Sequence, residues 1–296
     1  MTTFIYSNGY TMDWAEHVFP VHKFRMVYER LIKEGVVRKD AFLEPKPATY
    51  NELTLIHTPE YISMLNDMAE RKDTYAEIPI TEEVINSFKL SVGGSILAGR
   101  EAVKNGAAAN LSGGFHHAFS EHGEGFCLIN DIAVTIRVLQ NDGHIQRAAV
   151  IDCDLHQGNG TAKIFANDKD VFTFSIHQEH NYPIKEKSNW DIGLDDFSGN
   201  EEYISALRDA IPKVLDIHKP DFVAYVAGAD PYEEDQLGLL KLTKAGLLER
   251  DRIVLTNTIE RKIPILVLPA GGYARRMEDV VDIHFNTFKL LKELNS

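Results

Sequence analysis

The sequence predicts an α/β fold in which helices wrap a mainly parallel β-sheet. Apolar runs of strand length alternate along the chain with amphipathic stretches of helical length, and this alternation is typical of that class. No Gly/Ser-rich linker, low-complexity segment or internal repeat interrupts the 296 residues. We therefore expect a single domain over residues 1–296, which is long enough to bury a substantial core.

Six apolar runs are predicted as strands, because a continuous apolar run indicates a strand that is covered on both faces. They span residues 4–6, 107–111, 148–153, 171–176, 222–227 and 263–268. Between them, apolar residues recur with helical spacing, and capping residues such as Thr58 and Gly106 stand at the ends of these stretches. The predicted helices span residues 58–70, 82–106, 130–143, 201–218, 244–261 and 278–294.

The chain is acidic, with a formal net charge of −13 at pH 7, and this charge argues against a nucleic-acid-binding surface. Its two cysteines, Cys127 and Cys153, lack the spacing of a disulfide framework or a zinc ribbon, which favours a reducing compartment. The first residues carry neither the basic nor the apolar region of a signal peptide, and no apolar run approaches the ~20 residues that cross a bilayer. We therefore expect a cytoplasmic protein without a membrane span.

Polar side chains that can take part in catalysis follow four of the six predicted strands. Ligands of parallel sheets bind outside the carboxyl ends of the strands, so these side chains are expected at one rim of the sheet. Unrelated surface residues would not fall so regularly at strand ends, and we predict an active site there. The residues are His116 and His117 after the second strand, Asp154 and His156 after the third, Asp230 after the fifth and Tyr273 after the sixth.

The stretch IDCDLHQGNG, residues 151–160, places Asp152, Asp154 and His156 at every second position. Successive side chains of a strand alternate between faces, so an extended chain would aim these three the same way. A half-buried strand with a solvated acidic face is one interpretation, but the apolar run before these residues leaves no solvated side. Neighbouring buried carboxylates repel each other and lose hydration, so a bound metal ion is the simplest explanation.

Asp154, His156 and Asp230 would give a metal ion three protein ligands and leave one position open, as is typical of a catalytic site. Zn²⁺ suits this donor set, although two carboxylates and one imidazole also hold Fe²⁺ or Co²⁺. The adjacent histidines supply acid–base capacity near neutral pH, and Tyr273 on a glycine turn can donate to a developing oxyanion. These parts predict metal-assisted hydrolysis of an amide.

Five motifs carry a family resemblance: GGFHHA, EGFCLINDIA, IDCDLHQGNG, AGADPYEEDQLG and AGGY. In this order and at about this spacing, they make the chain resemble the zinc-dependent histone deacetylase family, and most of all its class IV branch. HTPEYI and GGSILAGREAV extend the resemblance over nearly the whole length. The resemblance implies the arginase/deacetylase fold, with a central eight-stranded parallel sheet, and hydrolysis of N-acyl-lysine or related amides.

The resemblance also implies roles for individual residues, beginning with Asp154, His156 and Asp230 as the zinc ligands. The matches to the catalytic residues are His117 as the general base and acid, His116 as its electrostatic partner, Asp152 as the carboxylate that orients His116, and Tyr273 as the oxyanion-stabilising residue. The matches to the acyl-lysine tunnel are Gly125, Phe126, Tyr182 and, at the rim, Leu237. The matches to a structural potassium site are Asp152, Asp154, His156, Ser175 and Ile176.

Asn159 departs from the class I pattern, which has an aspartate behind the second histidine, and agrees with class IV members. An amide can orient the His117 imidazole, but it stabilises the protonated ring less than a carboxylate would. We therefore expect a lower pKa at His117 than in a relative that carries the aspartate.

The sequence leaves several alternatives for the function. The substrate is an acyl-lysine peptide or protein, with an acetyl or a long-chain acyl group, or it is an acylated small amine such as an acetylated polyamine. A catalytically silent acyl-lysine binder would be expected to have lost a metal ligand or the tyrosine, and this chain retains both. An arginase-like two-metal enzyme would need more Asp and His residues than these motifs contain.

Overall fold

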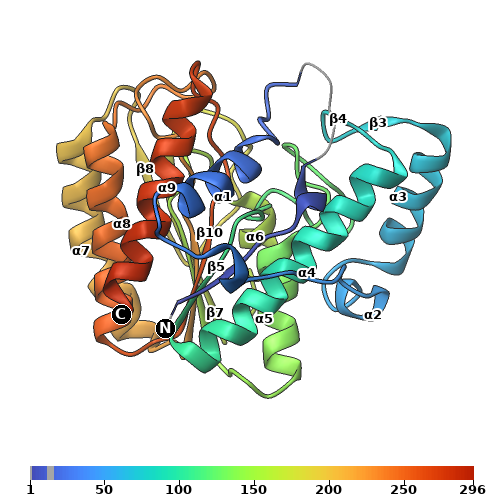
Figure 1. The fold of residues 1–296 in the computed structure, drawn as a ribbon, viewed down its shortest axis with the longest axis horizontal. Coiled ribbons are helices and arrows are strands. Elements are labelled where there is room, and N and C mark those ends of the chain that lie inside the picture. Colours follow the sequence, from blue (N-terminus) through green and yellow to red (C-terminus); the bar gives the residue numbers. More distant parts are fainter. Residues whose placement is uncertain (1, 12–16) are drawn as a thin grey trace.

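The computed structural model describes residues 2–11 and 17–296, and its centre is an eight-stranded sheet in which all neighbouring strands pair in parallel (Figure 1). The strand order is β2-β1-β5-β10-β9-β6-β7-β8. The strands are β1 (Thr3–Ile5), β2 (Phe42–Leu43), β5 (Ala107–Asn110), β6 (Ala148–Asp152), β7 (Val171–Gln178), β8 (Trp190–Leu194), β9 (Phe222–Val226) and β10 (Ile265–Leu268). A separate antiparallel pair consists of β3 (Thr74–Tyr75) and β4 (Ile78–Pro79).

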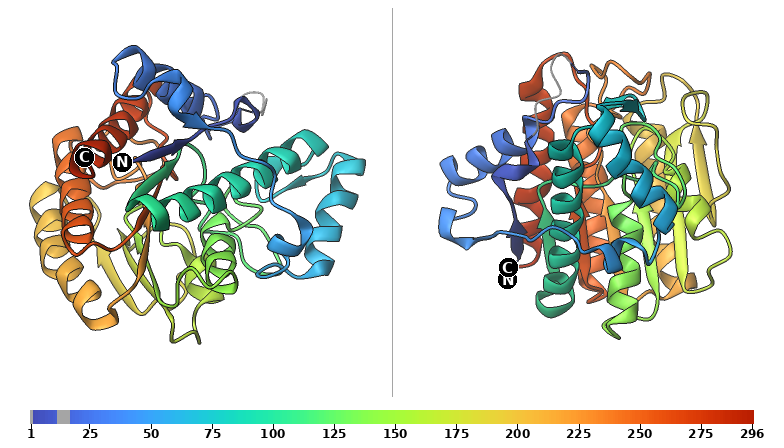
Figure 2. Two further views of the ribbon diagram at one scale, coloured as in Figure 1. Left: turned by 60° about the horizontal axis from the view of Figure 1, so that its bottom comes forward. Right: turned by 90° about the vertical axis from the view of Figure 1, so that its right-hand side faces the viewer.

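Helices cover both faces of the sheet, as the two views of Figure 2 show. One layer contains α1, α9, α8 and α7, which contact one another in that order, and the other contains α4, α5 and α6. The helices are α1 (Lys23–Lys33), α2 (Tyr50–Leu53), α3 (Pro59–Arg71), α4 (Glu82–Asn105), α5 (Asp131–Asn141), α6 (Asn159–Ile164), α7 (Asn200–His218), α8 (Lys244–Glu260) and α9 (Met277–Leu294), with 3-10 turns at Asn8–Tyr10 and Lys39–Ala41. No helix in the described part of the chain is long and apolar enough to cross a membrane.

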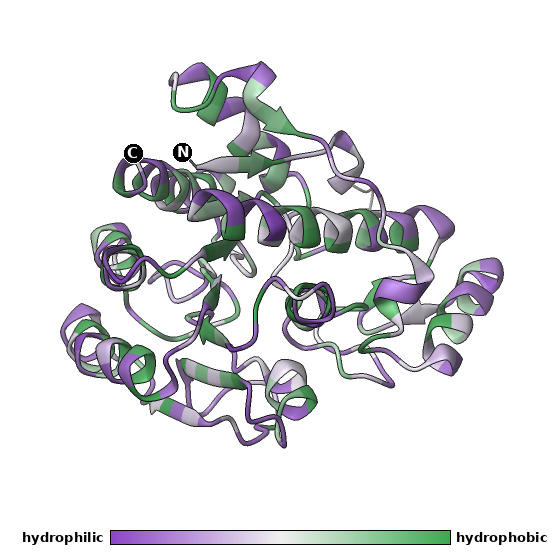
Figure 3. Ribbon diagram, turned by 90° about the horizontal axis from the view of Figure 1, so that it is seen from below, coloured by the Kyte–Doolittle hydropathy of each residue, from purple (hydrophilic) through white to green (hydrophobic). Residues whose placement is uncertain are grey.

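The core has two parts, one on each face of the sheet. Alternate residues of β6 belong to different parts: Ala149 and Ile151 pack in one cluster, and Ala148 and Val150 pack in the other. This explains why the central strands are apolar at consecutive positions up to their polar carboxyl ends. In Figure 3 the hydrophobic stripes of the helices face the sheet, and their hydrophilic stripes face outward.

The six predicted strands are present, with ends that differ by one or two residues. At the site, β6 ends at Asp152, one residue earlier than predicted, and Asp154 lies in the loop that follows the strand. Strands β2 and β8, which form the two edges of the sheet, were not predicted from the sequence. The reason is that β2 has two residues, and β8 carries an exposed aspartate and a glycine in WDIGL. Helices α1, α2 and α6 were also not predicted.

The strand order explains how distant motifs reach one site. Strands β5, β10, β9 and β6 lie side by side in the middle of the sheet, and their carboxyl ends are at the same edge because all are parallel. The loops after these four strands carry all the polar residues that the sequence placed at strand ends.

Candidate active site

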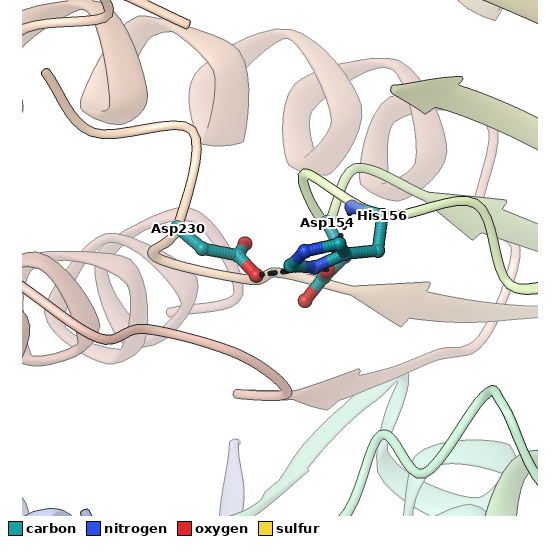
Figure 4. A group of neighbouring side chains, drawn as sticks. All are labelled: Asp154, His156 and Asp230. Atoms are coloured by element: carbon teal, nitrogen blue, oxygen red, sulfur yellow. Dashed lines mark hydrogen bonds and ion pairs between the residues drawn. The ribbon is translucent and has the colours of Figure 1, made fainter. Parts of the chain in front are cut away.

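The three predicted metal ligands converge in the structure. Asp154 and His156 lie between β6 and α6, and Asp230 follows β9, the neighbouring strand. Each residue offers one ligand atom within 4.8 Å of the others, and all three side chains are buried. Figure 4 shows the Asp230 carboxylate and the His156 ring pointing toward each other from separate loops. One cation can therefore contact all three groups.

The electrostatics of this cluster favour a positive charge at its centre. Burial alone would lower the pKa of His156, but hydrogen bonds and charges from Asp154 and Asp230 raise it to about 10. The buried Oδ2 atom of Asp230 has no hydrogen bond of good geometry, although it lies 3.3 Å from His156 Nδ1. A divalent cation would replace the proton and satisfy this oxygen. Because Zn²⁺ accepts carboxylate and imidazole ligands, the residues present fit a zinc ion.

Backbone amides donate hydrogen bonds to both carboxylates. The Gly271 N–H donates to Asp154 Oδ2 at 2.9 Å, and the Leu155 N–H donates to Asp230 Oδ1 at 3.0 Å. Hydrogen bonds to a carboxylate stabilise its ionised form and restrict its rotamer. The loops after β6 and β10 therefore position the candidate ligands before any ion is bound.

A buried ion pair lies beneath the same loops, and no motif indicated it. Arg250 of α8 is completely buried, and its Nη2 lies 2.7 Å from Asp251. Its Nη1 donates to the carbonyl oxygen of Gly228 and, at 3.2 Å, to that of Cys153. These carbonyls lie one or two residues before the candidate ligands, so a single guanidinium ties together the ends of β6 and β9.

The two adjacent histidines form a hydrogen-bonded pair. Nε2 of His116 lies 3.1 Å from Nε2 of His117, and the other ring nitrogens lie 2.7 Å from Asp152 Oδ2 and 2.8 Å from Asn159 Oδ1, respectively. Burial would lower the pKa of His116, but the charges of Asp152 and Asp154 raise it to about 9. Burial and the charge on His116 hold the pKa of His117 well below its ordinary value. The pair therefore consists of a cationic His116 and a neutral His117.

A pocket of about 270 Å³ opens beside these groups. Its lining contains the four predicted tunnel residues, a candidate metal ligand and two candidate catalytic residues. The lining residues are Glu77, His117, Gly125, Phe126, His156, Asn181, Tyr182, Leu237 and Tyr273. The structure thus brings together residues from loops that lie far apart in the sequence.

One wall of the pocket has an unusual backbone. Gly125 and Phe126 have φ angles of +49° and +64°. A Cβ atom at position 125 would lie 2.7 Å from both His117 Cδ2 and Tyr182 Oη, so the close approach requires glycine. The left-handed conformation of Phe126 costs about 1 kcal/mol. The Phe126 N–H donates to Ala76 O at 3.1 Å, which holds this wall in place.

Tyr273 follows β10, and its backbone N–H donates to Asp235 Oδ2 at 2.7 Å. Burial and the charge of Asp230 hold the pKa of its hydroxyl well above the ordinary value, so the group remains a proton donor at neutral pH. Lys23 is buried near this ring, with Nζ 6.0 Å from the ring centroid, and it donates to Ala270 O. Burial lowers the pKa of Lys23 to about 8.

The residues matched to a potassium site lie on β6, β7 and the loop after β6. Ser175 is directly opposite Asp152 in the β6–β7 ladder, and Ile176 follows it, buried. Burial raises the pKa of Asp152, so a nearby cation would stabilise its charge. Ser175 Oγ also lies 2.9 Å from His177 Nδ1.

Three residues at the pocket were not predicted from the sequence. Glu77 and Asn181 line it, and both lie in loops outside the five motifs. Glu124 belongs to the motif EGFCLINDIA, yet the motif did not indicate its contacts. Its Oε1 accepts hydrogen bonds from Asn159 Nδ2 at 3.1 Å and from Tyr182 Oη at 2.9 Å.

Several proteins are similar to this chain in sequence. A family model described as "Histone deacetylase domain" matches residues 17–288. The chain is 38% identical over 275 residues to an uncharacterized protein of Picosynechococcus sp., with 91% of each chain covered. It is 31% identical over 293 residues to histone deacetylase 2 of Arabidopsis thaliana, with 94% of this chain and 76% of that protein covered. It spans 58% of probable histone deacetylase 1-A of Xenopus laevis, at 29% identity over 285 residues and with 88% of this chain covered.

Two solved structures have the same fold as this chain. The HDA15 HD domain matches with a TM-score of 0.84 and 22% identity, covering 98% of this chain and 90% of that chain. A histone deacetylase homolog, crystallised with SAHA, matches with a TM-score of 0.84 and 24% identity, covering 99% of this chain and 84% of that one. Together with the buried Asp-His-Asp cluster, the sequence matches identify a histone deacetylase-like hydrolase. The chain belongs to the histone deacetylase family.

Proposed function

We propose that the protein hydrolyses N-acyl-lysine amides with the help of a metal ion. The observation that carries this proposal is the convergence of His117, His156 and Tyr273 on one pocket. These side chains come from three different loops, and two of them have protonation states that suit amide hydrolysis: His117 is neutral and Tyr273 keeps its proton. The proposal also assigns Gly125, Phe126, Tyr182 and Leu237 to the tunnel that receives the acyl-lysine side chain.

The residues take the following parts in the proposed reaction. Zn²⁺, held by Asp154, His156 and Asp230, would polarise the amide carbonyl and lower the pKa of a water molecule. Neutral His117 accepts a proton from the attacking water and later donates it to the leaving amine. Tyr273 donates a hydrogen bond to the oxygen on which negative charge develops.

His116 and Asp152 act on His117 rather than on the substrate in this proposal. The 2.7 Å hydrogen bond from His116 Nδ1 to Asp152 keeps His116 protonated, and this positive charge lowers the pKa of His117. Asn159 orients the His117 ring through the other nitrogen. His117 is therefore able to act as a base at a pH where an ordinary histidine is partly charged.

The size of the pocket favours a short acyl group. Its volume of about 270 Å³ lies just below the range of ~300–1,000 Å³ that is typical of sites for drug-sized ligands. An acetylated lysine side chain can enter while its peptide stays outside, whereas a myristoyl chain needs additional space. We infer that acetyl-lysine is the better substrate and that a long-chain acyl group requires the pocket to widen.

An acylated small amine is the second candidate substrate, and the acidic mouth of the pocket favours it. Glu77 lines the pocket, and Glu124 lies beside Tyr182 with about a third of its side chain exposed. Carboxylates at an entrance attract cationic ligands, such as the free amines of an acetylated polyamine. A direct comparison of substrates separates the two candidates.

The first experiment compares lysine peptides that carry acetyl, octanoyl or myristoyl groups with an acetylated polyamine, using zinc-loaded protein. Release of an acyl group, at least a hundredfold slower in Tyr273→Phe, supports the hydrolase because removing an oxyanion donor costs about 10²–10³ in rate. The preferred compound identifies the substrate class. If no compound is turned over, the proposal is wrong, and a catalytically silent acyl-lysine binder becomes the favoured hypothesis.

Three finer assignments belong to this proposal. We place the chain nearer the class IV branch because Asn159, rather than an aspartate, contacts His117. We propose a structural K⁺ near Asp152 and Ser175, since these residues are neighbours in a region rich in buried carboxylates. We also propose a reducing, cytoplasmic location, because the cysteines are both free.

A further inference from the structure

Five side chains form a continuous line of hydrogen bonds that ends in a carboxylate on each side. Asp152 contacts His116, His116 contacts His117, and His117 contacts Asn159, at 2.7, 3.1 and 2.8 Å. Asn159 then contacts Glu124 at 3.1 Å. An ionised carboxylate only accepts hydrogen bonds, so the two ends determine the direction of the donors between them.

The end at Glu124 determines how the Asn159 amide is turned. The amide has one accepting oxygen and one donating nitrogen, and the nitrogen must face Glu124 because Glu124 only accepts. The oxygen then faces His117 Nδ1, at 2.8 Å. An oxygen at this position requires a proton on His117 Nδ1, which leaves Nε2 as the accepting nitrogen of the neutral ring.

The opposite orientation of the Asn159 amide would prevent the His117 ring from acting as a base. If the amide of Asn159 were turned by 180°, its nitrogen would donate to His117 Nδ1 and the ring proton would move to Nε2. Nε2 is the nitrogen that faces His116, and in the proposed reaction it accepts the proton of the attacking water. A ring protonated only at Nε2 cannot accept that proton.

The geometry points to Glu124 as a positioning residue that, with the protonated His116 on the other side of the ring, fixes the tautomer of His117 through the amide of Asn159. This inference rests on the proposed function for its effect on rate, but the tautomer itself is a property of the free protein. The acceptor in question is Oε1 of Glu124, which also receives the hydroxyl of Tyr182 at 2.9 Å. Tyr182 lines the pocket, so the same oxygen joins the pocket wall to the histidine.

Oε1 of Glu124 accepts hydrogen bonds from Asn159 and Tyr182, whereas the contact with His122 is made by the other oxygen. The other oxygen, Oε2, lies 3.8 Å from His122 Nε2, and His122 is partly exposed and stacks on Phe119. No other charged group of the described residues forms an ion pair with Glu124. Replacing the carboxylate therefore changes the partners of Asn159 and Tyr182 directly.

The test measures the protonation of the His117 ring nitrogens by ¹⁵N NMR of zinc-loaded protein, with the signals assigned from a His117→Phe sample. We expect Nδ1–H in the wild type and a larger share of the Nε2–H tautomer in Glu124→Met, which keeps the length of the side chain but removes the strong acceptor, so that only the proton on His116 Nε2 still favours Nδ1–H. Glu124→Gln is expected to retain Nδ1–H, since its oxygen can still accept from both donors. In parallel, kcat of Glu124→Met falls about tenfold or more with little change in KM, and Glu124→Gln recovers most of it.

Glu121→Gln is the matched control, because Glu121 lies in the same loop with an exposed side chain and, among residues 2–11 and 17–296, forms an ion pair only with His122, at 3.7 Å. If Glu124→Met does not fold, Glu124→Leu replaces it. An unchanged Nδ1–H signal in the folded variant that lacks the acceptor overturns the inference. If the wild type releases no acyl group from any substrate, the proposed function fails, but the NMR comparison still decides whether Glu124 sets the tautomer.

Discussion

Replacing His57 with glutamine should remove part of the acid sensitivity of the fold. His57 is only 1% exposed, and burial lowers its pKa from 6.5 to about 4. Its Nε2 accepts a hydrogen bond from the Asn130 N–H at 3.0 Å, a contact that needs the neutral ring. Asn130 caps α5 and donates to Ala118 O, next to the catalytic histidine pair. Acid that protonates His57 therefore acts on the loop that carries the active site.

The magnitude follows from the pKa difference. Between pH 6.5 and pH 4 the unfolded chain protonates His57 while the folded protein does not, so stability is lost as the pH falls. The difference of about 2.5 units corresponds to about 3 kcal/mol at pH 4, at about 1.36 kcal/mol per unit. His57→Gln can still accept from Asn130, but it does not titrate.

The assay is urea denaturation at pH 7 and pH 4, with chelator present so that metal release does not contribute. The wild type should lose about 3 kcal/mol more than His57→Gln between these pH values. His144→Gln, at an exposed position, is the control and should behave as the wild type. Equal losses in the wild type and His57→Gln would refute the reasoning, because they would show that buried His57 is not held neutral.

Two further predictions concern residues beside the candidate site. In Asn159→Asp the new carboxylate faces Glu124, which lies 3.1 Å from Asn159 Nδ2, so repulsion between the two carboxylates should lower activity. The double variant Asn159→Asp with Glu124→Gln should recover this activity. It should also move the acidic limb of the kcat/KM profile to higher pH, because a carboxylate stabilises protonated His117. An acidic limb that does not move contradicts this account. Arg250→Met should lower the free energy of unfolding by about 3–5 kcal/mol and weaken zinc binding, since Asp251 loses its buried partner and the loops after β6 and β9 lose a shared anchor. Arg252→Met, half exposed on the same helix, should change stability by less than about 0.5 kcal/mol, and equal effects of both variants would argue against the anchor.

The centre of the fold could be predicted from the sequence because it depends on local pattern. Strands β6, β9 and β10 are apolar at consecutive positions, and this pattern can be recognised without knowing which strands lie beside them. The edge strand β8 is different, since it is partly exposed, contains Gly193 and forms only along β7. Its conformation depends on a partner that the local sequence does not reveal.

The residues of the candidate site also differ in whether the local sequence reveals them. Residues such as Asp154 and His156 stand out because their chemistry and spacing are unusual for a buried strand end. Glu124 and Arg250 act through contacts with segments up to about a hundred residues away, and neither residue type is rare enough to draw notice. Their importance became visible only when the hydrogen-bond partners were known.

The position of β10 between β5 and β9 has a consequence for how the protein is synthesised. The ribosome makes this central strand after every other strand of the sheet, and Tyr273 follows it. Until then β5 and β9 present open, apolar edges that can pair with other chains. A nascent chain is thus both inactive and prone to aggregation until β10 has been made, and we expect its yield in cells to depend on chaperones that shield these edges.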